Sequence, residues 1–225
     1  MALQHSNSLA LSSANGFLVL EGVNGAGKSS LQRTIAAHLY KLGDEVLQTF
    51  KPGDTPVGKE IRRLVLSSGR ELHPLTELFL FTADRVEHVS EVILPALQAG
   101  KRVISDRFTY STLAFQGYGR DLDLAFISKV NEVATAGCTP DLVILLDVDP
   151  LVGLRRNAVK GGADAFEEEN EEFQRRLREG FLRIAESSPE PFVVIDASQP
   201  LEKVTKEALR IVDEWRSQIV SRRCS

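Results

Sequence analysis

A short glycine-rich stretch near the start of the chain has the composition of a phosphate-binding loop. Residues 22–29 read G-V-N-G-A-G-K-S, which fits the spacing G-x-x-x-x-G-K-[S/T]. Glycines let backbone N–H groups surround a phosphate, Lys28 can reach the β- and γ-phosphates, and the Ser29 hydroxyl can ligate Mg²⁺. The residues expected to hold a nucleoside triphosphate are Gly22, Val23, Asn24, Gly25, Ala26, Gly27, Lys28, Ser29 and Ser30.

A second group of polar residues follows an apolar run at residues 102–105. Asp106 and Arg107 come directly after it, at the carboxyl end of an expected strand, where ligands of α/β proteins gather. Asp106 can hold Mg²⁺ through water, and Arg107 can neutralise a phosphate during transfer. Phe81 and Arg85 are four residues apart on an expected helix and share a face. Such a ring can stack on a base while the guanidinium bonds its carbonyl edge.

A phosphate loop alone does not name the reaction, because GTPases, ATPases and small-molecule kinases all carry one. The chain has no Asn-Lys-x-Asp guanine signature and no Asp-x-x-Gly switch element. These absences disfavour a GTPase-like switch.

The elements that must position these residues alternate between strand and helix patterns. Buried strands are expected at residues 17–21, 45–50, 102–105, 141–148 and 192–196. Helices are expected at residues 31–42, 75–98 with a kink at Pro95, 164–187 and 201–220. This order predicts an α/β fold with a parallel sheet of about five strands and helices on both faces.

The expected helix at residues 164–187 carries acidic residues early and arginines later. Glu171 with Arg175, and Glu172 with Arg176, have the favourable i,i+4 orientation for ion pairs. We interpret this charge run as a solvated helix face.

Length and composition limit the class of protein. With 225 residues and 43% hydrophobic residues, the chain suits one α/β domain, expected at 16–225 behind a poorly ordered tail at 1–15. The net charge of −4 argues against sequence-independent binding of nucleic acid. No apolar run approaches the roughly 20 residues that span a membrane, and residues 1–16 resemble neither a signal nor a transit peptide. Two cysteines suggest no disulfide framework, so we expect a reduced, cytoplasmic protein.

Several ordered motifs together resemble the bacterial thymidylate kinase family, which phosphorylates dTMP with ATP. They cover nearly the whole chain after the tail. They are Glu21-Gly22…Gly27-Lys28-Ser29, Pro52-Gly53-x-Thr55, Glu60-Ile61-Arg62, Thr76-Glu77-Leu78, Phe81-x-Ala83-Asp84-Arg85, Asp106-Arg107-Phe108, Ser111-Thr112-x-Ala114-Phe115-Gln116-Gly117-x-Gly119-Arg120, Leu146-Asp147-Val148 and Ile195-Asp196-Ala197.

The resemblance implies a P-loop kinase fold with a small mobile lid at about residues 150–166, ATP and Mg²⁺ as cofactors, and a place in dTTP synthesis. It also implies a homodimer, with the helix at residues 75–98 as a candidate interface. Catalysis would then be positioning and charge neutralisation by Lys28, Mg²⁺ and arginines.

The resemblance also implies a substrate site with assigned roles. Phe81 would stack on thymine, Arg85 would donate to its O4, and Thr112 with Gln116 would meet the base or sugar. Phe115 stands where the family often has Tyr, crowding the 2′ side of the sugar. The cations on the dTMP phosphate would be Arg62 and Arg107, and Ser111 belongs to the same substrate-binding segment.

Two stretches depart from the family pattern near the loop. Asn24 stands where the family usually has an acidic residue that meets the sugar 3′-hydroxyl, and an amide can bond a hydroxyl only without charge. Lys51 and Asp54 replace Glu and Gly of the common Arg-Glu-Pro-Gly-Gly-Thr, which points to a rebuilt turn.

A third departure concerns the catalytic arginine of the family. Gly25 stands where some members carry it in the loop, so the lid is expected to supply it. Arg156 is the first candidate and Lys160 the second, because the frequent Asp-Arg pair of the lid ends in Ala165 here. The alternative is that Arg155 and Arg156 lie on a surface helix without a catalytic role.

Two other functions stay open at this point. The chain can be a kinase for another nucleoside monophosphate or a nucleoside, as the changes at Asn24 and Lys51 suggest. It can also be a nucleotide-binding paralogue whose lid no longer supports transfer.

Overall fold

The computed structural model describes residues 16–67, 71–158 and 165–223, and the expected tail at 1–15 lies outside them. The strands are β1 (Phe17–Glu21), β2 (Val46–Phe50), β3 (Arg102–Asp106), β4 (Leu142–Asp147) and β5 (Phe192–Asp196). The helices are α1 (Lys28–Lys41), α2 (Pro56–Val65), α3 (Pro74–His88), α4 (Leu94–Gln98), α5 (Thr109–Thr112), α6 (Leu124–Thr135), α7 (Pro150–Ala158), α8 (Glu171–Ser187) and α9 (Leu201–Arg223), with π-helical turns η1 (Val89–Ile93) and η2 (Leu113–Gly119).

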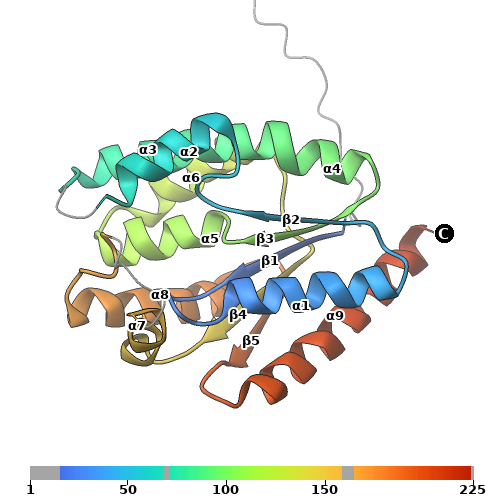
Figure 1. The fold of residues 1–225 in the computed structure, drawn as a ribbon. Helices are drawn as coiled ribbons and strands as arrows, with labels where there is room; N and C mark the ends of the chain where they lie inside the picture. Colours follow the sequence, from blue (N-terminus) through green and yellow to red (C-terminus); the bar gives the residue numbers. More distant parts are fainter. Residues whose placement is uncertain (1–15, 68–70, 159–164, 224–225) are drawn as a thin grey trace, which may run out of the picture.

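The strands form one parallel sheet in the order β2-β3-β1-β4-β5, so the prediction of a five-stranded parallel sheet is confirmed. Each predicted strand is present, with ends that differ by at most one residue. Figure 1 shows helices on both faces of the sheet, with α1 and α9 packed together on one of them. The connections that leave β1 and β3 run toward opposite edges of the sheet. The carboxyl ends of two such neighbouring strands are where α/β proteins bind ligands.

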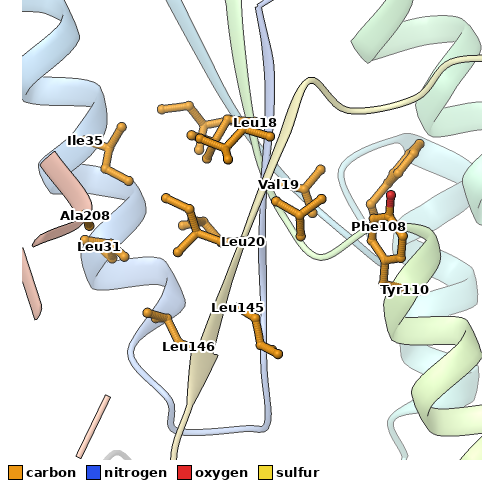
Figure 2. Close-up of a cluster of buried hydrophobic side chains, with 14 of the residues drawn as sticks. Leu18, Val19, Leu20, Leu31, Ile35, Phe108, Tyr110, Leu145, Leu146 and Ala208 are labelled. Atoms are coloured by element: carbon orange, nitrogen blue, oxygen red, sulfur yellow. The ribbon is translucent and has the colours of Figure 1, made fainter. Parts of the chain in front are cut away.

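Strand β1 is the centre of the core, and its residues from Phe17 to Glu21 are all buried. Because successive side chains of a strand point to opposite faces, β1 feeds both layers. Figure 2 shows Leu18 and Leu20 on the side of Leu31, Ile35 and Ala208, and Val19 on the side of Phe108 and Tyr110.

The helical segment expected at residues 75–98 is present and continuous, but it changes type before Pro95. Helix α3 ends at His88, the π-helical turn η1 follows, and α4 completes the segment. Proline has no backbone N–H and its ring crowds the preceding turn, so the regular hydrogen-bond ladder cannot continue through it. The irregularity is therefore a widened turn next to Pro95.

The charged helix is shorter than the sequence predicts, because α8 begins at Glu171 and not at residue 164. Asn170 sets this start, since its side chain accepts a hydrogen bond from the backbone N–H of Phe173 at 2.9 Å. The two predicted ion pairs of this helix are confirmed at 3.6 and 3.9 Å on an exposed face.

Replacing a leucine of β1 tests the core assignment. Leu20→Ala is expected to lower the free energy of unfolding by about 3 kcal/mol, because Leu20 is fully buried and truncation leaves a cavity. Leu201→Ala is the matched control, since Leu201 is 68% exposed and its truncation is expected to cost under about 0.5 kcal/mol. Urea unfolding followed by the fluorescence of Trp215, the only tryptophan, measures both. Equal losses in the two variants would contradict the assignment.

Candidate active site

The glycine-rich loop joins β1 to α1 and curls around its own lysine. The Lys28 Nζ donates to the carbonyl oxygens of Gly22 and Val23, both at 3.0 Å. Gly25 has a φ of 75°, and a Cβ there would lie 1.9 Å from the carbonyl oxygen of Gly153 in α7. Because α7 packs this closely, an arginine at position 25 is sterically excluded in this conformation. The loop therefore has the backbone shape of a phosphate-binding site, and Lys28 is its one cationic side chain.

The two residues expected to hold a metal ion meet at the start of α1. The Ser29 hydroxyl donates to Asp106 Oδ2 at 2.7 Å, and this contact is open to solvent. Asp106 reaches it because β3 ends beside the loop. A hydroxyl and a carboxylate next to a triphosphate cradle fit Mg²⁺, which takes one or two protein oxygens and completes its shell with phosphates and water.

Arg107 lies where the loop and β3 meet, and its guanidinium is held on several sides. Its Nη1 donates to the Gly22 carbonyl and to Ser111 Oγ, both at 3.0 Å, and its Nη2 donates to Asn24 Oδ1 at 2.6 Å. The guanidinium also lies over the Phe115 ring, 5.1 Å from its centroid. The backbone φ of Arg107 is 76°, a conformation that is uncommon for residues other than glycine.

A buried carboxylate lies beneath Arg107. Glu21 accepts the backbone N–H of Phe108 at 2.8 Å, the N–H of Ser111 at 3.1 Å and the Ser111 hydroxyl at 2.6 Å. Burial raises the pKa of Glu21 above its ordinary value, against the opposing effects of Arg107 and of these hydrogen bonds. Glu21 therefore fixes the backbone that carries Arg107 and Ser111.

Two cavities adjoin at Arg107. One, of about 270 Å³, is lined by loop residues, Asp106 and Arg107. The other, of about 120 Å³, is lined mostly by aromatic and polar side chains behind it. Both cavities are lined by Asn24, Lys51, Arg62 and Arg107.

Aromatic rings close the smaller cavity. The Phe166 ring lies 6.0 Å from the Phe81 ring and 5.1 Å from the Phe115 ring, as centroid distances. Thr112 and Gln116 add buried polar groups to the same wall. A flat, partly polar ring fits such a cavity, so Phe81, Thr112, Phe115 and Gln116 lie where a base would bind.

Arg85 lies behind this wall and is not among the residues that line the cavity. It is fully buried, and its guanidinium donates to Thr112 Oγ1, to Asn131 Oδ1 and, at 3.2 Å, to the Phe108 carbonyl. Burial lowers the pKa of Arg85 to about 10, which keeps it charged near neutral pH. In this arrangement Arg85 reaches a base only through Thr112.

The turn after β2 brings Arg62 and Lys51 to the boundary of the two cavities. Arg62 is exposed and donates to the Pro52 carbonyl at 2.8 Å. Lys51 is buried, with its Nζ 2.8 Å from the Phe81 carbonyl and 3.4 Å from Asp84 Oδ2. Burial, with Arg85 nearby, lowers the pKa of Lys51 to about 7.

The structure does not place either candidate for the catalytic cation of the lid, Arg156 or Lys160, in the site. Arg156 Nη1 donates to the Ala197 carbonyl beyond β5 at 3.0 Å, and Arg156 lines neither cavity in the part of the chain that the structure describes. Lys160 lies outside the described residues. Instead, Asn157 and Glu167 line the larger cavity.

Sequence reasoning did not identify several residues that line the cavities, among them Lys51, Asn157, Phe166 and Glu167. Phe166 closes the base end, while Asn157 and Glu167 flank the loop. The Glu167 carboxylate accepts from the Asn24 side chain at 2.9 Å. The sequence held one signal for Glu167. Asn24 is an amide where the family usually has an acidic residue, and a carboxylate close to this position explains the change.

A triphosphate cradle on a parallel sheet, with a second cavity at the carboxyl ends of its strands, defines a P-loop kinase fold. The family model for thymidylate kinase matches residues 20–208. The chain belongs to the thymidylate kinase family.

Individual relatives agree with this assignment. The thymidylate kinase of Deinococcus radiodurans is 41% identical over 198 residues, covering 88% of this chain and 96% of its own. That of Pelotomaculum thermopropionicum is 44% identical over 200 residues, covering 88% and 93%. The crystal structure of thymidylate kinase from Ehrlichia chaffeensis superposes with a TM-score of 0.73 at 30% identity, covering 89% of this chain and 99% of that one.

A buried histidine supports the turn that carries Lys51. His88 Nε2 lies in hydrogen-bond contact with the Thr49 hydroxyl, which also contacts Asp54. Burial, with the charges of Lys51 and Arg85, lowers the pKa of His88 to about 3. His88 is therefore neutral in the folded protein at neutral pH.

This histidine predicts a loss of stability in mild acid. Between pH 7 and 5 the unfolded chain binds a proton on His88, with a pKa of about 6.5, and the folded chain does not. The wild type is therefore expected to lose about 2 kcal/mol more of its free energy of unfolding than His88→Gln over this range. Urea unfolding at both pH values measures the difference, and identical pH dependence in the two proteins would contradict it.

Proposed function

We propose that this chain transfers the γ-phosphoryl group of ATP to dTMP, giving dTDP for dTTP synthesis. The observation that carries the proposal is the pair of adjoining cavities, one on the phosphate loop and one lined by aromatic rings, with Arg107 between them. Membership of the thymidylate kinase family supports dTMP as the acceptor.

The loop side holds ATP. Backbone N–H groups of the loop and the start of α1 bind the phosphates, and Lys28 turns from the loop carbonyls to the β- and γ-phosphates. Ser29 and Asp106, which lie in contact at the start of α1, would hold Mg²⁺. When bound, Mg²⁺ neutralises charge on the phosphate oxygens.

The aromatic side holds the thymine base. Phe81 presents its ring to the base, and Gln116 is held by Glu77, to which its Nε2 donates at 2.7 Å. The Thr112 oxygen accepts from Arg85, which leaves the Thr112 hydroxyl hydrogen to be donated to a carbonyl of the base. Arg85 thus orients Thr112, and Phe115 beside Arg107 fills the space where a ribose 2′-hydroxyl would lie.

The reaction needs no activated side chain, because the nucleophile is an oxygen of the dTMP phosphate. That oxygen attacks the γ-phosphorus in line, the bond to the β-phosphate oxygen breaks, and ADP leaves. Arg62 and Arg107 neutralise the two phosphates that must approach each other.

The lid completes the charge neutralisation. Arg156 must release the Ala197 carbonyl to reach the transferred group, and Lys160 is the other candidate. The exposed position of Arg156 at the end of α7 permits such a change of partner.

Removing the central cation tests the proposed activity. Arg107→Ala is expected to lower kcat/KM for dTMP by about 100-fold or more, because a preorganised charge is lost at the transferred group. Arg210→Ala, which removes an exposed arginine of α9, is the control and is expected to keep the wild-type rate.

The measurement is ADP release from Mg·ATP with dTMP, dUMP, dCMP, AMP and thymidine in parallel. Preference for an acceptor other than dTMP would assign the chain a different substrate. No turnover with any acceptor, while ATP binds, would make it a nucleotide-binding paralogue.

We also propose a homodimer through the outer face of α3 and α6. Phe79 and Val86 of α3 are half-exposed, and the Phe79 ring meets that of Phe126 in α6 at 6.5 Å. Val133, also on α6, is 75% exposed. A second copy of this chain would bury these apolar side chains together.

The other proposed properties follow from these. The described residues after position 15 act as one domain, and the partners are the small-molecule substrates.

Among the described residues, no helix combines the length and apolar character needed to cross a membrane. Cys138 is buried as a free thiol, which fits the cytoplasm that we propose as the location.

A charge on the proposed interface tests the dimer. Phe79→Asp is expected to shift the mass measured by light scattering from a dimer to a monomer, because an aspartate there would be buried without a partner. Tyr40→Asp is the control, since Tyr40 is exposed on α1, away from this face. A wild-type monomer, or a dimer that survives Phe79→Asp, would contradict the proposal.

A further inference from the structure

A chain of polar contacts runs from Arg107 through the loop to the segment before α8. Arg107 Nη2 donates to Asn24 Oδ1 at 2.6 Å, and Asn24 Nδ2 donates to Glu167 Oε1 at 2.9 Å. The same Glu167 oxygen accepts from the Asn157 side chain in α7. The phosphate loop and α7 therefore meet at one carboxylate, which lies before α8.

The middle of this chain needs a group that both accepts and donates a hydrogen bond, and the amide of Asn24 does both. A guanidinium can only donate hydrogen bonds, and an ionised carboxylate can only accept them. Asn24 accepts from Arg107 with its oxygen and donates to Glu167 with its nitrogen, so both partners fix the orientation of the amide. An aspartate at this position would still accept from Arg107, but it would face the Glu167 carboxylate with a like charge.

Packing holds Glu167 in this place. The preceding residue, Phe166, is buried between the rings of Phe81 and Phe115. Glu167 itself is half-buried and lines the larger cavity beside the loop. Its carboxylate is thus directed toward Asn24 by an anchored backbone.

The contacts leave part of Arg107 available for a ligand. A guanidinium has five N–H donors, and three hydrogen bonds to Gly22, Ser111 and Asn24 occupy three of them. The remaining two suffice for a forked contact with a phosphate. The direction of that fork depends on the three contacts that hold the group.

We infer that Glu167 is a positioning residue that acts through Asn24 to aim Arg107 at the phosphate of the acceptor nucleotide. The inference rests on the proposed function, since the acceptor is dTMP. Among the described residues, Glu167 lines the larger cavity and is not one of those that line the smaller cavity, where the base is proposed to bind. Its effect is therefore expected at the phosphate. Because Arg107 and Glu167 bond the two ends of the Asn24 amide, we expect this amide not to bond the sugar 3′-hydroxyl, and a nucleoside without a phosphate then binds independently of these contacts.

Calorimetric binding of dTMP and of thymidine separates this role from a general structural one. Glu167→Ala is expected to weaken dTMP binding about tenfold and to leave thymidine binding within about twofold, because a hydrogen bond to a charged group is lost only on the phosphate side. Glu168→Ala is the matched control, since Glu168 is exposed and next in sequence. Thermal melting checks that each variant is folded.

A double-mutant cycle tests whether Glu167 acts on Arg107 through Asn24. In the wild-type background, Glu167→Gln is expected to leave dTMP binding unchanged or weaker. In the Asn24→Asp background, which is expected to bind dTMP about tenfold less tightly, the same substitution is expected to recover binding, since Gln can donate to Asp where Glu repels it. A mere change of charge near the phosphate would instead give Glu167→Gln the same effect in both backgrounds.

The outcomes are distinct. The inference is overturned if Glu167→Ala keeps the wild-type preference for dTMP over thymidine, or if the effect of Glu167→Gln is equal in the two backgrounds. If Glu167→Ala does not fold, the double-mutant cycle tests the inference instead, because it uses Glu167→Gln. A wild type that binds dTMP no better than thymidine would overturn the proposed function and the inference together.

Discussion

The site depends on one buried carboxylate at the end of the central strand. Glu21 has no exposed surface and accepts three hydrogen bonds from Phe108 and Ser111. A buried carboxylate without partners would cost several kcal/mol, so these bonds hold the segment after β3 firmly against β1. The left-handed backbone of Arg107 persists because its own N–H bonds the Leu20 carbonyl at 2.9 Å and the residues after it are held by Glu21.

Arg107, which lies on the segment that Glu21 holds in place, forms the boundary between the two halves of the site. Arg107 bonds the phosphate loop through Gly22 and Asn24, and it lies on the Phe115 ring of the base cavity. A kinase must bring two negatively charged phosphates together and keep water away from them. A cation bonded to the loop and packed on the base cavity meets the first requirement by its position.

Much of the fold could be predicted from the sequence, because its signals are local. The apolar runs gave all five strands, and the loop spacing placed Lys28 and Ser29 correctly beside β1. The start of α8 could not be predicted from charge spacing, since it is set by the cap at Asn170.

The site was predicted only in part, because its remaining features depend on contacts between distant segments. Helical spacing placed Phe81 and Arg85 on one face, but burial separates them, with Phe81 lining the cavity and Arg85 behind Thr112. The contact of Glu167 with Asn24 joins residues 143 positions apart, which no local pattern reveals.

A crystal structure of this chain with dTMP and a non-hydrolysable ATP analogue tests the central claim most directly. The account predicts the dTMP phosphate on the Arg107 guanidinium, the thymine between Phe81 and Thr112, and Asn24 still bonded to both Arg107 and Glu167. A dTMP phosphate bound away from Arg107, with Arg107 still paired only to protein groups, would contradict it.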